Sequence, residues 1–271
     1  MSISIDSIGF VGGGQMAEAM IRGILVSGLV SADNVMVAEP TSTRCELLQG
    51  QYGIACTTDP EELCANCTVL VLAIKPQLAA QVLKAYQPYL GDQHLVISIM
   101  AGVPLASLVE LLGESRRLIR VMPNTPALVL AAATAFSPNQ RATEHDRSIA
   151  QAIFSAVGNS VEVPESQLDA VTGLSGSGPG YVFTFIEAMI DGGVLAGLPR
   201  PVAEKLVLQT VYGSAKLALE TGEHPAVLKG KVTSPGGTTI AGIQALEEGS
   251  LRGVVMAAVE AATQRSRELG A

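Results

Sequence analysis

The feature that most constrains the fold is a glycine triplet close to the start of the chain. A short apolar run, residues 8–11, enters Gly12, Gly13 and Gly14, and the residues that follow have the spacing of an amphipathic helix. Read as G-x-G-x-x-A, with Ala17 in the last place, this strand, turn and helix match the pattern that holds a dinucleotide pyrophosphate at a helix N-terminus. A tight turn without a ligand is the alternative.

Apolar runs of strand length recur over the first 160 residues and alternate with helical spacing. Strands are expected over residues 8–11, 34–38, 68–74, 94–99, 118–121, 131–136 and 160–163, and helices over residues 17–26, 77–89, 103–112 and 144–157. This alternation predicts an α/β fold with a Rossmann-type, doubly wound parallel sheet.

The pattern changes near residue 164, where strand-like runs end and long helical spacing begins. Helices are expected over residues 181–196, 201–221 and 252–269. We therefore predict two domains, an NAD(P)-binding Rossmann-type domain over residues 1–163 and an all-helical domain over residues 164–271. The helix from residue 181 is apolar on more than one face, so we expect it to be buried on more than one side.

The choice between NAD and NADP rests on the end of the second strand. Glu39 stands near the place of the fingerprint acid, which accepts from a ribose 2′-hydroxyl and favours NAD. Thr41, Ser42 and Arg44 follow, however, and could hold the 2′-phosphate of NADP. The two signals conflict, and we favour NADP. A loop-capping Glu39 with a solvated Arg44 is the alternative without a ligand.

Two further motifs follow expected strands. Lys75 and Pro76 end the run at residues 68–74, and ligands of open parallel sheets lie beyond the carboxyl ends of strands. We expect this pair to face the coenzyme or substrate, although a solvated lysine is an equal reading. The sequence MPNTP, residues 122–126, has two prolines that suit a rigid wall for a ring such as nicotinamide, and a plain turn is the alternative.

A second glycine-rich turn, SPGGTT over residues 234–239, precedes another helical pattern. The amides of Gly236, Gly237, Thr238 and Thr239 would form an anion nest at a helix N-terminus, and such a nest suits a carboxylate. An ordinary helix start capped by Thr238 or Ser234 is the alternative.

Composition and charge exclude several classes of protein. The formal net charge is -8 and the sequence pI is about 4.9, so the chain offers no basic face to nucleic acid or to an anionic membrane. Neither a signal peptide nor a membrane-spanning run is recognised, and we expect a cytoplasmic protein. Hydrophobic residues make up 48% of the chain and the mean hydropathy is +0.37, which suggests contact with another subunit.

The cysteines and histidines give little sign of a metal site, and none is expected. Cys64 and Cys67 form a C-x-x-C pair, but no second pair or nearby histidine accompanies them. We interpret them as small buried or half-buried residues. The three histidines are scattered and are interpreted as surface or capping residues.

The motifs together resemble the pyrroline-5-carboxylate reductase family over essentially the whole chain. The resemblance rests on IGFVGGGQMAEAM, AIKP, RVMPNTPAL, VTGLSGSGPGYVFTFIEAM, GLPR, TGEHPAVLK and VTSPGGTTIAGI. It implies NAD(P)H-dependent reduction of the cyclic imine 1-pyrroline-5-carboxylate to L-proline, the last step of proline biosynthesis, by hydride transfer to the imine carbon. It further implies a homodimer with interlocked helical domains, which in this family often assembles into decamers, and NADPH as coenzyme with NADH as the alternative.

The resemblance also implies roles for single residues. The pyrophosphate would be held by Gly12, Gly14, Gln15 and Met16, and the nicotinamide and its ribose would be bordered by Ala73, Lys75 and Asn124. The substrate carboxylate would be bound by Ser234, Gly237, Thr238 and Thr239. The Thr239 hydroxyl would also bond to the ring nitrogen as the catalytic group, and Ser175 and Ser177 would line the same pocket. Gly180 departs from the usual alanine of the family.

Two other functions stay open. A beta-hydroxyacid dehydrogenase would share the first glycine turn, but it needs a lysine acid or base in the helical domain, and none lies within a glycine motif. A non-catalytic NAD(P)H-sensing protein would also keep the first turn, but would have no reason to keep the second anion nest.

Overall fold

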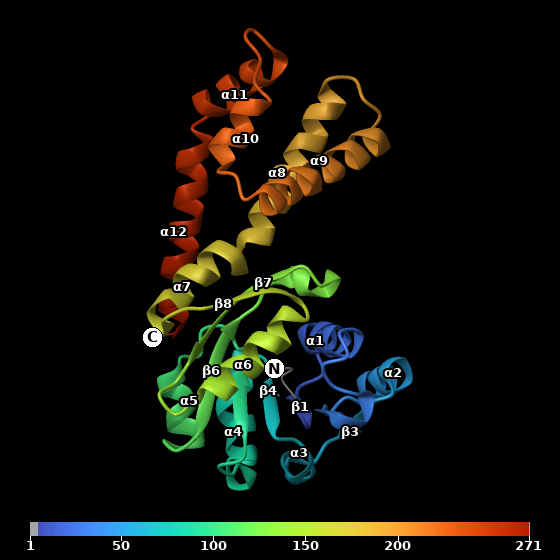
Figure 1. Cartoon of the computed structure of the whole chain (residues 1–271), viewed down its shortest axis with the longest axis vertical. Coiled ribbons are helices and arrows are strands. Elements are labelled where there is room, and N and C mark those ends of the chain that lie inside the picture. Colours follow the sequence, from blue (N-terminus) through green and yellow to red (C-terminus); the bar gives the residue numbers. More distant parts are fainter. Residues whose placement is uncertain (1–4, 271) are drawn as a thin grey trace. The chain divides into compact units, whose positions relative to one another are not determined.

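A computed structural model describes residues 5–270 of the chain (Figure 1). Its sheet has eight strands in the order β3-β2-β1-β4-β5-β6-β7-β8. The strands are β1 Ile8–Val11, β2 Val35–Ala38, β3 Ala55–Thr57, β4 Val69–Leu72, β5 Leu95–Ser98, β6 Arg117–Met122, β7 Ala132–Pro138 and β8 Gly158–Glu162. The first six strands have the 3-2-1-4-5-6 order of a Rossmann fold, which confirms the predicted class.

One pairing departs from the predicted all-parallel sheet. β7 runs antiparallel to β6, whereas β8 is again parallel to β7. The link from β6 to β7 contains only a short 3-10 helix, η4 Thr125–Val129, and lacks the long crossover that parallel neighbours require. The sheet is therefore mostly parallel.

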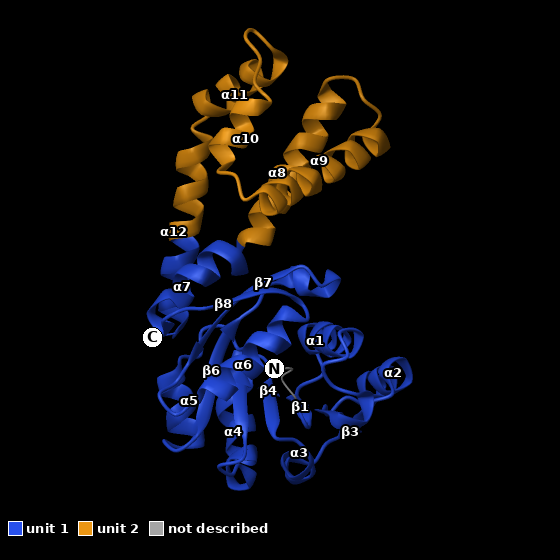
Figure 2. Ribbon diagram, viewed as in Figure 1, with its two compact units in different colours: residues 1–177, 261–271 blue, residues 178–260 orange. Residues whose placement is uncertain are grey.

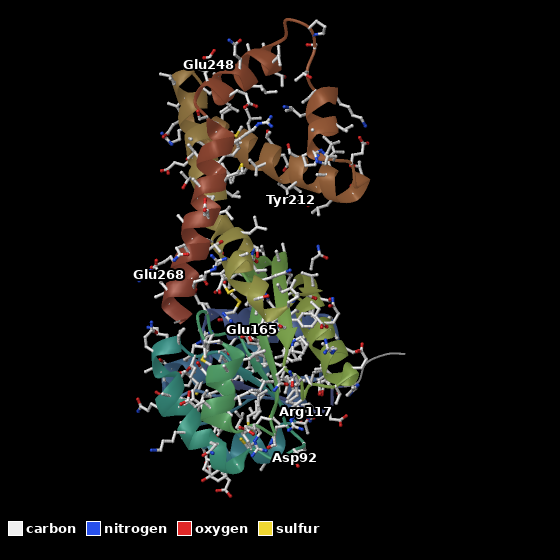
Figure 3. The ribbon with its side chains drawn as sticks, turned by 90° about the vertical axis from the view of Figure 1, so that its left-hand side faces the viewer. Asp92, Arg117, Glu165, Tyr212, Glu248 and Glu268 are labelled. Carbon is white, nitrogen blue, oxygen red and sulfur yellow. The ribbon has the colours of Figure 1, made fainter. Side chains whose placement is uncertain are left out.

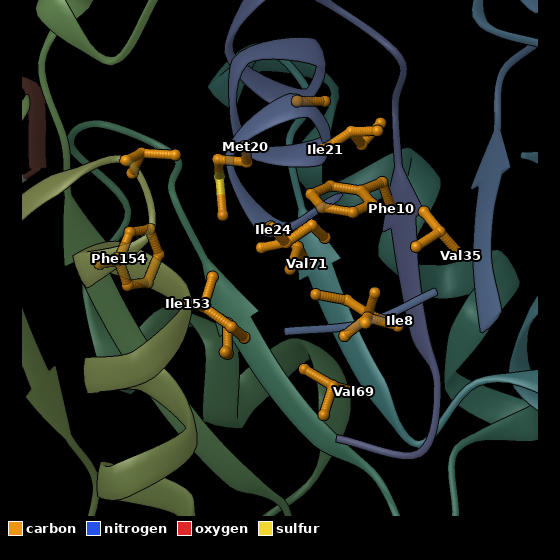
Figure 4. Close-up of a cluster of buried hydrophobic side chains, with 14 of the residues drawn as sticks. Ile8, Phe10, Met20, Ile21, Ile24, Val35, Val69, Val71, Ile153 and Phe154 are labelled. Atoms are coloured by element: carbon orange, nitrogen blue, oxygen red, sulfur yellow. The ribbon is translucent and has the colours of Figure 1, made fainter. Parts of the chain in front are cut away.

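Helices cover both faces of this sheet. They are α1 Gln15–Val26, α2 Ser42–Tyr52, α3 Pro60–Asn66, α4 Ala79–Tyr86, α5 Leu105–Leu112, α6 Glu144–Ser155 and α7 Leu168–Val171. Successive residues of a strand point to opposite faces, so β4 contributes Val69 and Val71 to one core cluster and Leu70 and Leu72 to the other. The first cluster also contains side chains from α1 and α6 (Figure 4).

The remaining helices belong largely to a second unit (Figure 2). They are α8 Gly178–Leu195, α9 Arg200–Thr221, α10 Pro225–Lys231, α11 Thr238–Glu248 and α12 Leu251–Gly270. By its contacts the chain divides into unit 1, residues 1–177 and 261–271, and unit 2, residues 178–260. Residues 164–177 and the end of α12 thus pack with the sheet, and the boundary at residue 164 stays a prediction about functional domains.

Unit 2 buries few of its apolar side chains within this chain. Among its described residues, only Ala203 and Val207 of α9 are buried hydrophobic residues, and α8 has none. Leu195 is 91% exposed and Phe183 is 63% exposed. The prediction that this helix is buried on more than one side is therefore not met by the single chain. In the part of the chain that the structure describes, no helix combines the length and apolar character needed to cross a membrane.

Candidate active site

The first glycine turn joins β1 to α1 in a backbone conformation that requires glycine. Gly12 has φ +97°, and a Cβ there would lie 2.7 Å from the carbonyl oxygen of Ala73. Gly14 is the N-cap of α1 and makes no side-chain capping bond, and no atom lies within 4 Å of the place of its Cβ. The N-terminus of α1 consequently faces open space at Gly14, as close approach of a phosphate requires.

Glu39, at the end of β2, is hydrogen-bonded to this turn. Its carboxylate accepts from the Gly13 amide at 2.9 Å and from the Thr41 amide at 3.0 Å. Burial disfavours ionisation of the carboxyl, but the hydrogen bonds from Gly13 and Thr41 outweigh it and lower the pKa of Glu39. Each carboxylate oxygen can still accept a further bond, so a ribose hydroxyl remains compatible with this arrangement.

Arg44, in the first turn of α2, bonds to the glycine turn and to α1. It donates from Nε to the Gly13 carbonyl and from Nη2 to the Gly14 carbonyl, and it forms an ion pair with Glu18 of α1. The other oxygen of Glu18 accepts from the Tyr52 hydroxyl at 3.0 Å. The alternative of a solvated Arg44 is therefore wrong. Sequence reasoning missed the role of Glu18, because no motif marks an acid in the first turn of a helix as the partner of another helix.

A cleft of about 640 Å³ lies along this edge of the sheet. Among the predicted coenzyme residues it is lined by Gly12, Gly14, Glu39, Ala73 and Lys75, together with apolar side chains of Ile74, Leu78, Val82 and Tyr86. Lys75 is exposed at the turn after β4. In the described chain, the lining does not include the other predicted coenzyme residues, namely Gly13, Gln15, Met16, Ser42, Arg44, Pro76 and Asn124.

Ser42 instead lines a neighbouring hollow of about 500 Å³ with Glu39. A larger hollow of about 830 Å³ lies elsewhere on unit 1, between α5 and the ends of β7 and β8. It contains none of the predicted site residues. The cleft at the glycine turn is therefore the candidate coenzyme site.

The MPNTP loop is tied to the segment that contains the predicted serines. Asn124 is 8% exposed and donates from Nδ2 to the Ser175 carbonyl at 3.0 Å. Its Oδ1 accepts from the Ala133 amide at 2.9 Å. The Ser175 hydroxyl donates to the Val171 carbonyl at 3.1 Å. Both polar atoms of Asn124 are thus engaged inside the chain, a link between distant segments that the sequence did not reveal.

The second glycine-rich turn precedes α11 in unit 2. Gly236 has φ +65°, and the Gly237 amide donates to the Ser234 carbonyl at 3.0 Å. Gly237 is the N-cap of α11 and makes no side-chain capping bond. The alternative of a helix start capped by Thr238 or Ser234 is therefore wrong. Thr238 and Thr239 lie exposed in the first helical turn. The two glycine turns belong to different units of the chain, the first to unit 1 and the second to unit 2.

The cysteines of the C-x-x-C pair are buried in the second core cluster, which also contains Leu70 and Leu72 of β4. Cys64 and Cys67 are 4% and 3% exposed, and burial raises the pKa of Cys64 to about 11 and that of Cys67 to about 12. A thiol in this state is neutral near pH 7 and behaves as a small apolar group. The interpretation of both residues as buried packing residues is confirmed.

Two family models match the chain. A model described as pyrroline-5-carboxylate reductase dimerisation matches residues 165–269, and one described as NADP oxidoreductase coenzyme F420-dependent matches residues 7–102. The second match covers the glycine turn, and the first begins where strand-like sequence ends.

Similar proteins cover nearly the full length. A pyrroline-5-carboxylate reductase of Methanosarcina acetivorans is 48% identical over 98% of this chain and 98% of its own, and one of Arabidopsis thaliana is 44% identical over 97% and 95%. A solved structure of the Coxiella burnetii pyrroline-5-carboxylate reductase is 35% identical, with a TM-score of 0.94 over 99% of this chain and 100% of that one. The Plasmodium falciparum pyrroline carboxylate reductase, solved with NADP bound, is 35% identical, with a TM-score of 0.88 over 100% of both chains. With relatives of this identity and coverage, the chain belongs to the pyrroline-5-carboxylate reductase family.

Proposed function

We propose that this protein reduces 1-pyrroline-5-carboxylate to L-proline with a reduced nicotinamide coenzyme, as the last step of proline biosynthesis. The observation that carries the proposal is the presence of two uncapped glycine-rich helix starts, one at Gly14 and one at Gly237, in a chain of this family. An uncapped helix N-terminus attracts an anion. The reaction needs two such places, one for the coenzyme pyrophosphate and one for the substrate carboxylate.

The residues of the first turn fit a dinucleotide. A side chain at Gly12 would meet the Ala73 carbonyl, while the open place beside Gly14 leaves room for a phosphate. Gly12, Gly14, Gln15 and Met16 would hold the pyrophosphate, with Ala73 and Lys75 toward the nicotinamide and its ribose. When bound, the coenzyme supplies the hydride that reduces the carbon–nitrogen double bond.

The second turn would hold and orient the imine. The amides of Gly237, Thr238 and Thr239 would bind the carboxylate, with Ser234 beside them. The Thr239 hydroxyl would hydrogen-bond to the ring nitrogen, accepting from its N–H when the imine is protonated and donating to its lone pair when it is not. The imine carbon gains a hydride and the nitrogen carries a proton in the product, so a cyclic imine that arrives protonated needs no strong acid from the protein. Ser175 and Ser177 would complete the pocket.

NADPH is the proposed coenzyme, with NADH as the alternative. Support comes from the Plasmodium falciparum relative, whose structure contains NADP. The ionised Glu39 carboxylate would favour a free 2′-hydroxyl instead, so this residue supports the alternative.

The protein is further proposed to act as a homodimer with interlocked helical domains, and dimers to assemble into decamers. Apolar side chains exposed on α8, α9 and α12, together with Tyr212 of α9, would be covered by a second copy (Figure 3). A cytoplasmic location is also proposed, because all four cysteines are free thiols, as a reducing compartment maintains them.

The direct test is turnover by the purified protein. Pyrroline-5-carboxylate is supplied with NADPH or NADH, loss of the reduced coenzyme is followed by absorbance, and proline is identified as the product. Oxidation of beta-hydroxyacids without imine reduction would instead identify a dehydrogenase. Coenzyme binding without any turnover would identify a sensor.

A further inference from the structure

The strand β6 and its extension hold the segment that leads from the sheet into α8. Arg120 of β6 is 8% exposed and forms an ion pair with Glu165 at 3.1 Å. Its Nη2 also lies 4.0 Å from Asp169 of α7. The Asp169 carboxylate accepts from the Ser266 hydroxyl of α12 at 2.7 Å. The start of the segment is therefore held by the buried Arg120 guanidinium and the two partly exposed carboxylates of Glu165 and Asp169.

The next two contacts come from residues 122 and 124. A Cβ on Gly176 would lie 2.5 Å from Cε of Met122, so the Met122 side chain packs directly on this glycine. Asn124 then donates to the Ser175 carbonyl. Side chains two residues apart point to the same face of an extended strand. Arg120 and Met122 of β6, and Asn124 two residues beyond its end, thus set the position of residues 165–176 by three successive contacts.

The Asn124 contact meets a specific need of the backbone. Residues Thr172–Gly176 form a π-helical turn, in which the Ser177 amide donates to the Thr172 carbonyl at 2.8 Å. In an α-helix the Ser175 carbonyl would accept from residue 179, but that residue is proline and has no N–H. The Asn124 amide supplies a donor to this carbonyl. Single π turns inside helices are frequent at functional sites.

We propose that Asn124 is a positioning residue for the reaction, rather than a ligand of the coenzyme. Its amide fixes the π-helical turn and thereby the places of Ser175 and Ser177 in the proposed imine pocket. The inference rests on the proposed function. Because the side chain is buried with both polar atoms bonded, it acts through the turn and does not touch the reacting atoms.

The discriminating variant is Asn124→Asp, which keeps the acceptor for Ala133 but replaces the donor to Ser175 with an oxygen. We expect kcat/KM for the imine to fall about 10- to 100-fold, while the dissociation constant of the coenzyme changes less than about twofold. Thr134→Val is the matched control, because Thr134 Oγ1 is a buried hydroxyl of β7 without a hydrogen-bond partner among the described residues. It should leave both quantities unchanged. A wild-type protein without turnover would refute the proposed function, whereas an active wild type with a fully active Asn124→Asp variant refutes only the inference.

A second experiment separates positioning from simple stabilisation. Asn124→Ala should lower the melting temperature and the hydrogen-exchange protection of the Ser177 amide. Adding Pro179→Ala restores an N–H four residues after Ser175 but no acceptor for the Ala133 amide, so the melting temperature should recover in part in the double variant while kcat/KM stays low. If turnover recovers together with stability, the only role of Asn124 is to donate a hydrogen bond to the Ser175 carbonyl, and the inference is overturned.

Discussion

At the scale of residues, the Thr239 hydroxyl is the group expected to touch the reacting imine. Thr239→Ala should lower kcat about 10- to 1,000-fold, the range of a lost orienting or proton-donating contact. Thr239→Ser keeps the hydroxyl and should retain most of the activity. Steady-state kinetics at saturating coenzyme provide the measurement. An alanine variant as fast as the wild type would remove this hydroxyl from the mechanism.

Arg44 is expected to affect both coenzymes, because its contacts are to the glycine turn itself. It bonds to the Gly13 and Gly14 carbonyls and to Glu18. Arg44→Ala should lower the affinity for NADH and for NADPH by a similar factor, about 3- to 10-fold, because the turn becomes less ordered. Arg44→Lys retains the charge but cannot form the same fork of bonds, so its coenzyme affinity should lie between those of the wild type and Arg44→Ala. Calorimetric titration with each coenzyme tests this, and a loss confined to NADPH would assign Arg44 to the 2′-phosphate.

Glu39 should make stability depend on pH in the acidic range. Its pKa is lowered from 4.5 in the folded chain, so the ionised carboxylate stabilises the fold above that pH and the contribution is lost as pH falls through the lowered pKa. The difference in melting temperature between wild type and Glu39→Gln should be constant near neutral pH and shrink below about pH 4.5. Glu46→Gln, at an exposed position of α2, is the control. A difference that grows on acidification would contradict the assignment.

The sequence predicted these site residues unevenly. The glycine turn could be recognised because strand, turn and helix are local and adjacent. The bonds from Gly13 to Glu39 and from Asn124 to Ser175 join residues that are 26 and 51 positions apart, and no spacing rule reports such pairs. The family resemblance implied a place for Asn124 beside the nicotinamide, but it gave no sign that the side chain is buried and bonded to Ser175 and Ala133.

At the scale of elements, the contact of α1 with the end of α6 depends on a glycine. A Cβ on Gly23 would lie 2.4 Å from Val157 Cγ1 and 2.8 Å from the Ala156 carbonyl oxygen. Gly23→Ala should therefore destabilise the fold by about 1–3 kcal/mol through overpacking. A Cβ on Gly50 of α2 would have no atom within 4 Å. Gly50→Ala should therefore stabilise the fold by about 0.5–1 kcal/mol. Denaturant unfolding measures both, and equal effects would show that the α1 contact yields easily.

Elements with a strong apolar pattern were predicted well, and those without one were missed. The run at residues 68–74 contains β4, because a strand covered on both faces needs continuous apolar sequence. In α2 only Leu48 is buried, so this helix carries no apolar periodicity and was not predicted. The orientation of β7 could not be read either, because an apolar run has no direction and the short link after β6 decides the pairing.

At the scale of the whole molecule, helical spacing in the last third revealed the elements but not what covers them. Spacing reports which residues share a face of a helix, whereas burial depends on the neighbour. The helix α8 was expected to be buried, yet Phe183 and Leu195 are exposed in the single chain. Such a large apolar surface on one unit is typical of an interface rather than of a monomer.

The dimer can be tested by charging that surface. Phe183→Glu on α8 and Leu206→Glu on α9 each replace an exposed apolar side chain of unit 2, 63% and 55% exposed. We expect both variants to shift toward monomer in sedimentation and to lose imine turnover, because a charge cannot be buried unpaired between subunits. Coenzyme binding at the glycine turn of unit 1 should persist. Val26→Glu is the control, since Val26 is a 73% exposed apolar residue of unit 1 and lies outside the proposed interface. If the unit 2 variants keep the wild-type mass while Val26→Glu dissociates, the interface lies on the Rossmann unit instead.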